Sequence, residues 1–375
     1  MSRRCQFHLC APTGTESAYT VIFIGINKAH CLQLSDKKRD SENSPQTVNP
    51  NGKKILITGA TGFIGSHLTE LCVEQGYEVK AYDRYNPNND WGWLENSICK
   101  NDIQVILGDI RDYDSVYDAM KGCGAVFHLA ALISIPYSYV SPLAYIRTNI
   151  EGTYNVLESA KQQGISDILI TSTSETYGTA QYVPIDEKHP LIGQSPYSAS
   201  KIGADELAIS YHRSFGLPVK IVRPFNVFGP RQSARAIIPT IISQLLNSQG
   251  KIKLGNITPT RDFTFVKDTI SAFIEIHKSE NLLGKTTNVG TNKEISIGDL
   301  AQLIAENMGK KIEIIVDKQR IRPNDSEVDR LRCDNSTVLE YTSWKPEYTL
   351  ESGLKETIEW MKSNIQFYKH DRYNI

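Results

Sequence analysis

The chain has 375 residues, of which 40% are apolar and 22% are charged, and its formal net charge is −1. This length fits one large globular domain or two modest ones. The near-zero charge gives no basic field that would attract nucleic acid, and no apolar run approaches the roughly 20 residues of a membrane-spanning helix. We therefore expect a globular protein that binds neither nucleic acid nor a membrane.

The seven cysteines are scattered along the chain and form no CxxC pair. This spacing argues against a disulfide framework and against a zinc site. We therefore predict a reduced, cytoplasmic protein without a metal.

Residues 1–50 differ from the rest of the chain. A polar run at 37–51 with two prolines is typical of a flexible linker, and the stretch before it lacks the apolar core and cleavage site of a secretory signal. Arg3 and Arg4 precede the first acidic residue, Glu16, so a role in organelle targeting stays open. We expect a flexible N-terminal extension and assign it no function.

Strands and helices alternate from Lys53 onward. Short apolar runs predict strands, and 3.6-residue periodicity predicts helices between them. The expected strands are 54–58, 78–82, 104–107, 125–129 and 167–171, and the expected helices include 116–121 and 149–163. This alternation favours an α/β fold with a Rossmann-like, doubly wound parallel sheet over residues 51–224.

The alternation loosens after Pro224. Helical patterns remain at 237–246, 266–278, 297–308 and 350–362, mixed with short strands and loops. We interpret residues 225–375 as a smaller C-terminal α/β lobe that binds substrate, although some of its segments may return to the first domain. The substrate would lie in a cleft between the two parts, outside the carboxyl ends of the strands.

The turn Thr58–Gly65 has the spacing GxxGxxG after the first predicted strand and opens a predicted helix. Glycines let the backbone turn tightly and approach a pyrophosphate, while the helix N-terminus offers free N–H groups. This context indicates a dinucleotide site.

Asp83 ends the second predicted strand, where a carboxylate can accept hydrogen bonds from the adenosine ribose. The same charge would repel the 2′-phosphate of NADP, so NAD is favoured, although the neighbouring Arg84 could weaken this preference. Asp109, at the end of the third strand, would reach the adenine or cap the next helix.

Tyr197 and Lys201 are four residues apart and share one face of a predicted helix. A lysine ammonium near a phenol lowers the pKa of the phenol towards neutrality. The phenolate could then remove a sugar hydroxyl proton beside a nicotinamide. Upstream, Thr173-Ser174-Glu175 follow a strand, where catalytic groups lie in this architecture, unless Glu175 is merely solvated.

Six motifs together identify a family: GATGFIGSH at 59–67, FHLAA at 127–131, TNIEGT at 148–153, YSASK at 197–201, RPFNVFGPR at 223–231 and TRDFTFVKD at 260–268. The chain from about Lys53 to Lys362 resembles the extended short-chain dehydrogenase/reductase enzymes of the nucleotide-sugar epimerase/dehydratase group. The resemblance implies a homodimer packed through the Tyr-Lys helix and its neighbour. It also implies that NAD contacts Gly59, Thr61, Gly62, Phe63, Ile64, Gly65, Asp83, Asp109, Ile110, Leu129, Ala130, Ala131, Asn149, Tyr197 and Lys201.

Glu175 bears on the subfamily. Sugar 4-epimerases of the group usually have only hydroxyls and small residues at this place, whereas Ser-Glu is similar to GDP-mannose 4,6-dehydratases and to UDP-glucuronate decarboxylases. Four segments resemble the N-acetylglucosamine 4,6-dehydratases of legionaminic acid biosynthesis, namely 91–93, 135–139, 229–236 and 326–330. The chain departs from them in its first fifty residues and at 336–344, where Thr337 replaces the usual Lys.

The resemblance implies a 4,6-dehydratase mechanism. Tyr197 takes the C4 hydroxyl proton while hydride passes to NAD, Thr173 hydrogen-bonds that hydroxyl, and Lys201 holds the phenolate and the nicotinamide ribose. Glu175 then removes the C5 proton as a general base, and Ser174 assists loss of the C6 hydroxyl as water. Side chains expected near the nucleotide diphosphate are Asn226, Arg231 and Arg261.

Other functions stay open at this point. A decarboxylase would need a basic residue to receive a sugar carboxylate, and a 4-epimerase would share the same oxidation step. A non-enzymatic scaffold that kept the fold belongs to a different class, against which the intact Tyr197, Lys201 and Glu175 argue. The sequence does not decide between UDP and GDP as the nucleotide.

Overall fold

The computed structural model describes residues 54–248 and 250–369, and the predicted N-terminal extension lies outside them. A seven-stranded sheet forms the centre of this part of the chain, with the strand order β11-β6-β5-β4-β1-β2-β3 and all neighbours parallel. The strands are β1 (Lys54–Thr58), β2 (Glu78–Arg84), β3 (Ile103–Gly108), β4 (Ala125–His128), β5 (Asp167–Thr171), β6 (Val219–Pro224) and β11 (Thr286–Val289). The predicted fold class is confirmed.

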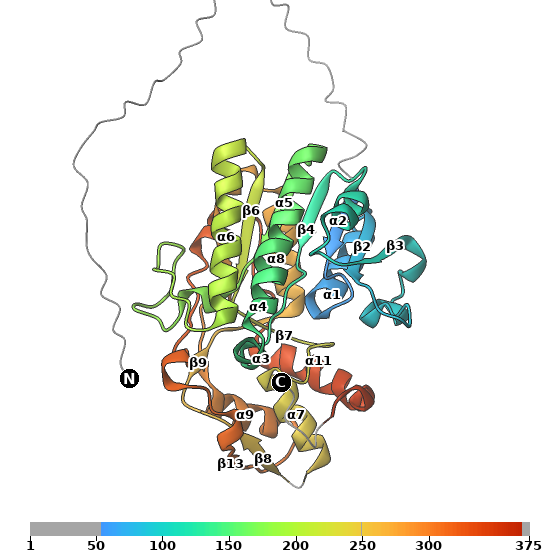
Figure 1. The fold of residues 1–375 in the computed structure, drawn as a ribbon. Coiled ribbons are helices and arrows are strands. Elements are labelled where there is room, and N and C mark those ends of the chain that lie inside the picture. The colour runs from blue at the N-terminus through green and yellow to red at the C-terminus, as the bar shows by residue number, and fades with distance from the viewer. Residues whose placement is uncertain (1–53, 249, 370–375) are drawn as a thin grey trace, which may run out of the picture. The chain divides into compact units, whose positions relative to one another are not determined.

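Helices cover both faces of this sheet (Figure 1). One layer contains α2 (Tyr113–Met120), α5 (Gly152–Gln163) and α6 (Pro196–Phe215), and the other contains α1 (Phe63–Glu74) and α8 (Val266–Lys278). Along β1, Ile55 and Ile57 join the core on the α1 side, whereas Leu56 joins the core under α2, α5 and α6. Burial on both faces explains why the strands are near-continuous apolar runs.

The predicted elements agree with the structure except near their ends. The strands expected at 54–58 and 167–171 and the helix expected at 266–278 have the predicted bounds. The helix expected at 149–163 begins instead as a π-helix, η4 (Ile146–Glu151), which continues into α5. A π-turn inside a helix is frequent at functional sites.

The chain after residue 224 contributes to both parts of the molecule. Its own small sheets pair β7 (Asn226–Phe228) with β10 (Phe263–Phe265), β9 (Thr260–Arg261) with β12 (Ile295–Ser296), and β8 (Lys251–Leu254) with β13 (Glu313–Val316). Around them lie α7 (Ile237–Asn247), α9 (Ile297–Asn307) and α11 (Leu350–Ser363). By contrast, α8 packs on α1, and β11 extends the central sheet beside β6, so a single boundary at 224 does not separate the two parts.

The order of the strands reverses at β1, which lies between β4 and β2. The chain therefore leaves the carboxyl ends of β1 and β4 in opposite directions and opens a crevice between them. Ligands of open α/β sheets bind at this switch point. None of the helices within residues 54–248 and 250–369 is long and apolar enough to cross a membrane.

Candidate active site

The turn after β1 brings two stretches of backbone unusually close together. Gly59 has φ +71, and a Cβ there would lie 2.8 Å from the Ala130 nitrogen. A Cβ at Gly65 would lie 2.0 Å from the Gly59 carbonyl oxygen. Only glycine allows both approaches, so the two glycines predicted from the sequence are required by the packing of the turn.

The N-terminus of α1 is suited to an anion. Its N-cap residue is Gly62, which has no side chain to cap the helix, and the first turn of this described helix contains no acidic residue. The first N–H groups of α1 therefore remain available, together with the partial positive charge of the helix end. This turn, which also includes the predicted residues Phe63 and Ile64, fits the pyrophosphate of a dinucleotide.

Asp83 lies at the end of β2 and holds the same turn. Its Oδ2 accepts hydrogen bonds from the Thr61 backbone N–H at 2.9 Å and from the Thr61 hydroxyl at 2.5 Å. Its Oδ1 accepts from the Arg84 N–H at 2.6 Å. Because a carboxylate has about four acceptor positions, Asp83 retains capacity for a ribose hydroxyl.

Asp109 pairs with Arg111, whose Nε lies 2.9 Å from Oδ1 and whose terminal nitrogen lies 2.5 Å from Oδ2. This pairing lowers the pKa of Asp109. The predicted alternative in which Asp109 caps the next helix is wrong, because Asp112 accepts the N–H groups of Asp114 and Ser115 there. Next to Asp109, the buried Ile110 packs against α5 at Gly152.

Leu129, Ala130 and Ala131 follow β4. Leu129 and Ala130 lie against Gly59 of the glycine turn, and the Ala130 N–H donates to the Thr58 hydroxyl at 3.2 Å. Asn149 lies behind them in η4. Its amide nitrogen donates to the Leu132 carbonyl and to the Ser200 hydroxyl, and its amide oxygen accepts from the Leu132 N–H. The geometry therefore makes Asn149 a brace between this loop and α6.

Tyr197 and Lys201 lie in the first two turns of α6 and are both buried. The helix begins with Pro196 after Ser195, whose side chain forms a capping box with Ser198. The Lys201 ammonium donates to the Thr171 carbonyl oxygen at 2.5 Å. The strand end of β5 thus fixes the lysine side chain.

Burial dominates the electrostatics of this pair. Burial raises the pKa of Tyr197, a hydrogen bond with Thr173 opposes the rise, and the charge of Glu175 adds to it. Burial lowers the pKa of Lys201, and the charge of Asp205 opposes this. Burial therefore outweighs the other contributions to the pKa of Tyr197 among the described residues, and the effect of Lys201 on the phenol stays a prediction.

Thr173, Ser174 and Glu175 follow β5. Thr173 caps the short helix η5 (Ser174–Tyr177) by accepting the Glu175 N–H at 3.3 Å, and Ser174 is buried. The half-buried Glu175 acts electrostatically on Tyr197 and also on Arg261, which is 6% exposed in β9. The structure therefore brings Thr173, Glu175, Tyr197 and Arg261 to one place.

The other two expected substrate residues behave differently. The Asn226 amide oxygen is buried and has no hydrogen-bond partner among the described residues, so it is available to a ligand. Arg231 instead forms a bidentate pair with Glu70, at 2.9 and 3.0 Å, and its guanidinium also donates to Ser66. In this structure the Arg231 guanidinium therefore binds side chains of α1 and does not form a free anion site.

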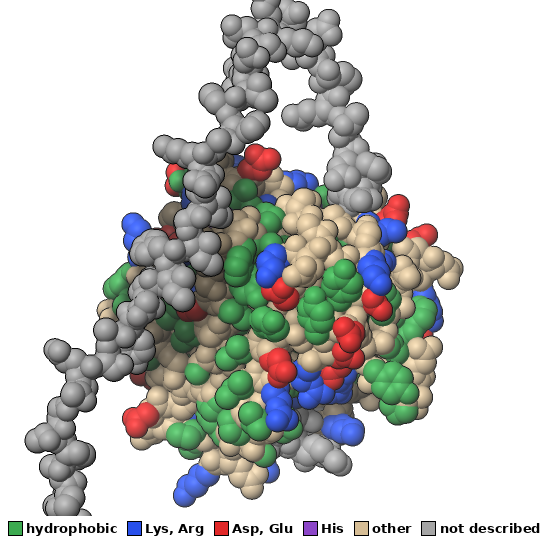
Figure 2. All heavy atoms as spheres, turned by 45° about the horizontal axis from the view of Figure 1, so that its top comes forward, with side chains coloured by type: hydrophobic (Ala, Val, Ile, Leu, Met, Phe, Trp, Pro, Cys, Tyr) green, Lys and Arg blue, Asp and Glu red, His purple; other side chains and the backbone are tan. Residues whose placement is uncertain are grey.

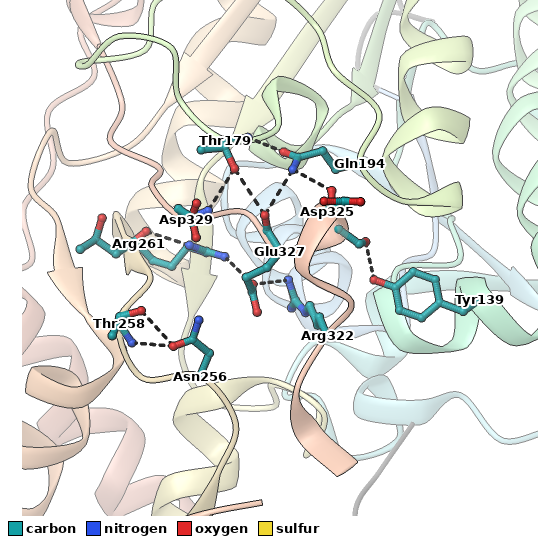
Figure 3. Close-up of polar contacts among 12 residues, drawn as sticks. Tyr139, Thr179, Gln194, Asn256, Thr258, Arg261, Arg322, Asp325, Glu327 and Asp329 are labelled. Atoms are coloured by element: carbon teal, nitrogen blue, oxygen red, sulfur yellow. Dashed lines mark hydrogen bonds and ion pairs between the residues drawn. The ribbon is translucent and has the colours of Figure 1, made fainter. Parts of the chain in front are cut away.

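Arg322 is a further candidate that sequence reasoning missed. The Glu327 carboxylate lies between it and Arg261, at 3.3 Å from Arg322 and 3.6 Å from Arg261 (Figure 3). The Glu327 carbonyl is held in turn by the Thr179 hydroxyl and the Gln194 amide. The position of Arg322, four residues before the start of the 326–330 segment, was a signal that could have drawn attention to it.

The four segments of the subfamily resemblance all lie near this region. Trp93 N–H donates to the Thr61 carbonyl at 3.2 Å, and Tyr139 on α3 (Ile135–Val140) hydrogen-bonds Ser326 at 2.6 Å. In the 229–236 segment, the charge of Arg235 acts on Tyr145, whose ring packs edge-on against Tyr197. One segment thus contacts the glycine turn, two contact each other, and the fourth acts on a neighbour of Tyr197.

A cavity of about 570 Å³ lies elsewhere, and none of the described candidate catalytic side chains lines it. Its wall includes Asp205 and Arg223, a buried pair 2.7 Å apart. It mixes acidic and basic side chains without a convergent set of ligand-binding groups, and we assign the chemistry to the crevice at β1 and β4 instead.

This sheet, glycine turn and Tyr-Lys helix define a dinucleotide-dependent protein of the short-chain dehydrogenase type. A family model described as GDP-mannose 4,6 dehydratase matches residues 56–357. The chain is 34% identical over 319 residues to a putative UDP-glucose 4-epimerase of Methanocaldococcus jannaschii, covering 83% of this chain and 99% of the relative. It is 31% identical to a UDP-N-acetyl-alpha-D-glucosaminuronate decarboxylase of Bacillus cytotoxicus, with coverage of 83% and 98%.

Among solved structures, the chain is similar to the dTDP-glucose 4,6-dehydratase DesIV of Streptomyces venezuelae with NAD and TYD bound. The TM-score is 0.77 at 26% identity, over 84% of this chain and 99% of that one. The chain therefore belongs to the extended short-chain dehydrogenase/reductase family of NAD-dependent nucleotide-sugar epimerases and dehydratases. The prediction of NAD is confirmed as the cofactor of this family.

We predict that Asp83→Asn shifts cofactor selectivity towards NADP. The amide still accepts from Thr61 but no longer repels a 2′-phosphate, so the ratio of NADP to NAD affinity should rise about 10-fold, which corresponds to about 1.4 kcal/mol. Calorimetric titration with both cofactors measures the ratio.

Thr61→Val is the matched control, because it removes a hydrogen bond to Asp83 and leaves the charge in place. It should weaken both cofactors alike. An unchanged ratio in Asp83→Asn would mean that Asp83 only holds the turn.

Proposed function

We propose that the protein is an NAD-dependent nucleotide-sugar 4,6-dehydratase that converts UDP- or GDP-N-acetylglucosamine to the 4-keto-6-deoxy sugar. The observation that carries this proposal is the position of Glu175 in η5, which follows the end of β5 where the Thr171 carbonyl holds Lys201, and the charge of Glu175 also raises the pKa of Tyr197. Oxidation at C4 and removal of the C5 proton need two separate proton acceptors beside one sugar ring. The resemblance of four surrounding segments to the dehydratases of legionaminic acid biosynthesis supports N-acetylglucosamine as the sugar.

When bound, NAD supplies the hydride acceptor for C4 and the hydride donor for C6. Tyr197 removes the proton of the C4 hydroxyl, and the Thr173 hydroxyl, which hydrogen-bonds the phenol, orients that group. Lys201, held by the Thr171 carbonyl, provides a positive charge behind the phenol and a donor for the nicotinamide ribose. Gly59 to Gly65 and Asp83 hold the rest of the cofactor.

The 4-keto group acidifies the C5 proton, which Glu175 removes as general base. The electrons of the C5–H bond form the C5–C6 double bond, and the C6 hydroxyl takes up a proton and leaves as water, with Ser174 assisting directly or through a water molecule. Hydride then returns to C6 while a proton returns to C5. The two protons removed from the C4 hydroxyl and from C5 thus balance the one lost in water and the one returned to C5. Arg261 and Arg322 bind the nucleotide diphosphate, since guanidinium groups match phosphate oxygens, and the unpaired Asn226 amide oxygen accepts a hydrogen bond from a donor group of the same substrate.

A decarboxylase is the second candidate, and Arg261 is the observation that favours it. This buried guanidinium lies within electrostatic reach of Glu175, so it could receive a sugar carboxylate there. Mass spectrometry of reactions with a panel of nucleotide sugars separates the two functions: loss of water from an N-acetylglucosamine nucleotide supports the proposal, and loss of CO₂ from a uronic-acid nucleotide contradicts it.

We also propose a homodimer packed through α5 and α6. Leu143 on α4 (Pro142–Tyr145), Ile146 on η4 and Tyr154 on α5 are roughly half exposed, and these elements pack beside α6. Figure 2 shows apolar side chains between charged ones on the face where α5 and α6 lie. Exposed apolar groups on adjoining elements are typical of an interface.

The first prediction from this subsection concerns Glu175→Gln. The variant keeps the size of the side chain but cannot accept the C5 proton, so C4 oxidation should proceed and the reaction should stall before water is lost. Mixed with an N-acetylglucosamine nucleotide, it should show the near-ultraviolet absorbance of reduced nicotinamide, roughly stoichiometric with enzyme, because a general base contributes about 10²–10⁴ in rate.

Glu187→Gln is the control, because Glu187 is a half-buried carboxylate that accepts from the Asn288 N–H and the Thr337 hydroxyl outside the proposed site. It should not accumulate reduced nicotinamide. In deuterated water the wild type should place deuterium at C5. Dehydration by Glu175→Gln at the wild-type rate would rule out the general-base role.

Tyr197→Phe should block the first step, with kcat reduced by about 10²–10⁴ because no group takes the C4 hydroxyl proton. Stopped-flow absorbance should show no reduced nicotinamide in a single turnover. Tyr211→Phe removes a phenol hydroxyl from the same helix, one that donates to Glu158, and should retain the wild-type rate. Activity of Tyr197→Phe within a few-fold of wild type would exclude the assigned role.

The dimer predicts a mass in sedimentation equilibrium of twice the 42.0 kDa of one chain. Ile146→Lys should shift the protein to monomer, because a lysine charge is costly to bury in an apolar contact. Ile98→Lys, at a side chain 91% exposed before the short helix η3 (Lys100–Asp102), is the control and should leave the mass unchanged. A monomeric wild type would contradict the proposed assembly.

A further inference from the structure

A buried histidine joins the cofactor turn to the helix layer behind it. His128 is the last residue of β4 and is 2% exposed. It pairs in register with Thr58, the last residue of β1, and its Nδ1 lies 2.7 Å from the Thr58 hydroxyl oxygen. The same hydroxyl accepts the Ala130 N–H, so Thr58, which precedes the glycine turn, connects that turn to His128 and to the loop after β4.

The other ring nitrogen leads towards the catalytic helix. His128 Nε2 lies 3.1 Å from the hydroxyl oxygen of Thr153 on α5, which donates to the Asn149 carbonyl at 2.7 Å. Asn149 in turn donates to the Ser200 hydroxyl at 2.9 Å, and Ser200 donates to the Tyr197 carbonyl at 2.7 Å. The connected groups thus run from Thr58 to the backbone of Tyr197.

The direction of each hydrogen bond follows from counting protons. Thr153 has one hydroxyl proton, which goes to the Asn149 carbonyl, so Thr153 must accept from His128. His128 therefore carries its proton on Nε2. Its Nδ1 is then bare and accepts the Thr58 hydroxyl proton, while Thr58 accepts from Ala130. Only this neutral tautomer satisfies every group.

The surroundings of His128 keep it neutral. Burial, with a smaller contribution from the Lys201 ammonium, lowers the pKa of His128 to about 3. A second proton on Nδ1 would also face the Thr58 hydroxyl proton and break the bond to β1. Burial and hydrogen bonding therefore both favour the neutral His128 ring, protonated on Nε2, at pH values around neutrality.

We propose that His128 is a positioning residue: as a fixed neutral connector it sets the spacing between the glycine turn that holds the cofactor and the helix that carries Tyr197 and Lys201. It does not touch the reacting atoms. The inference rests on the proposed function, since it assumes that these two residues act on a sugar beside bound NAD. A shift of about 1 Å between such groups can reduce a rate about 100-fold.

The connector is tested most cleanly through Thr153, because replacing His128 itself would leave a hole in the core. Thr153→Val keeps the shape and removes the acceptor for His128 Nε2. We expect kcat to fall about 10- to 100-fold and NAD affinity to fall about 10-fold because the turn is less preorganised. The sugar KM should change by no more than roughly twofold, since the diphosphate contacts remain.

Two variants provide controls. Thr357→Val removes a similar hydroxyl, since Thr357 is fully buried in α11 and donates to the Gly353 carbonyl at 2.7 Å, without a histidine partner. It should lower thermal stability without changing NAD affinity or kcat. Thr153→Ser keeps a hydroxyl at this position and should retain most of the wild-type NAD affinity and kcat. Equal effects of Thr153→Val and Thr357→Val on NAD affinity and kcat would overturn the proposal.

A second readout does not depend on turnover. In ¹⁵N spectra of histidine-labelled protein, His128 should show a protonated Nε2 and a bare Nδ1 between pH 5 and 9, and Thr153→Val should lose this fixed tautomer. A wild-type His128 that titrates in this range, or that carries its proton on Nδ1, overturns the inference. If no sugar nucleotide were dehydrated, the proposed function would fail while the spectra and the NAD titration still tested the connector.

Discussion

The backbone of the turn after β1 approaches the backbone after β4 so closely that a Cβ at Gly59 would lie 2.8 Å from the Ala130 nitrogen. This contact lies at the switch point of the sheet, where β1 and β4 send the chain in opposite directions. Because the two backbones approach this closely, the helix α1 and the loop after β4 are brought together around one crevice. The cofactor turn and the catalytic side chains are built on these two segments.

Burial sets the chemistry inside the crevice. Tyr197 and Lys201 both lie in the core, where the charged form of each is disfavoured, so the pKa of the phenol is raised and that of the ammonium is lowered. The Lys201 ammonium is compensated by the Thr171 carbonyl and by the charge of Asp205. Water exclusion therefore strengthens each remaining electrostatic contact at the site, including those between Glu175 and its neighbours Tyr197 and Arg261.

Residues far apart in the sequence meet in the second part of the fold. Relatives with epimerase and decarboxylase names cover nearly the whole described chain at similar identity, so the shared fold does not select a reaction. The four segments of the subfamily resemblance come instead from separate places in the sequence. Tyr139 and Ser326, 187 residues apart, meet through a hydrogen bond, and Glu327 joins Arg261 to Arg322.

The sequence by itself determined the doubly wound sheet, the glycine turn, the Tyr-Lys helix and the acidic end of β2, because strand and helix periodicity and short motifs are local properties of the chain. It could not show that β11 and α8 return to the first domain, since strand pairing over long separations leaves no local signal. Tertiary packing alone decided that Glu70 forms an ion pair with Arg231, that Asp112 rather than Asp109 caps α2, and that burial raises the pKa of Tyr197. Each of these depends on which groups are brought together and on how much water is excluded around them, and both are fixed only when distant segments meet.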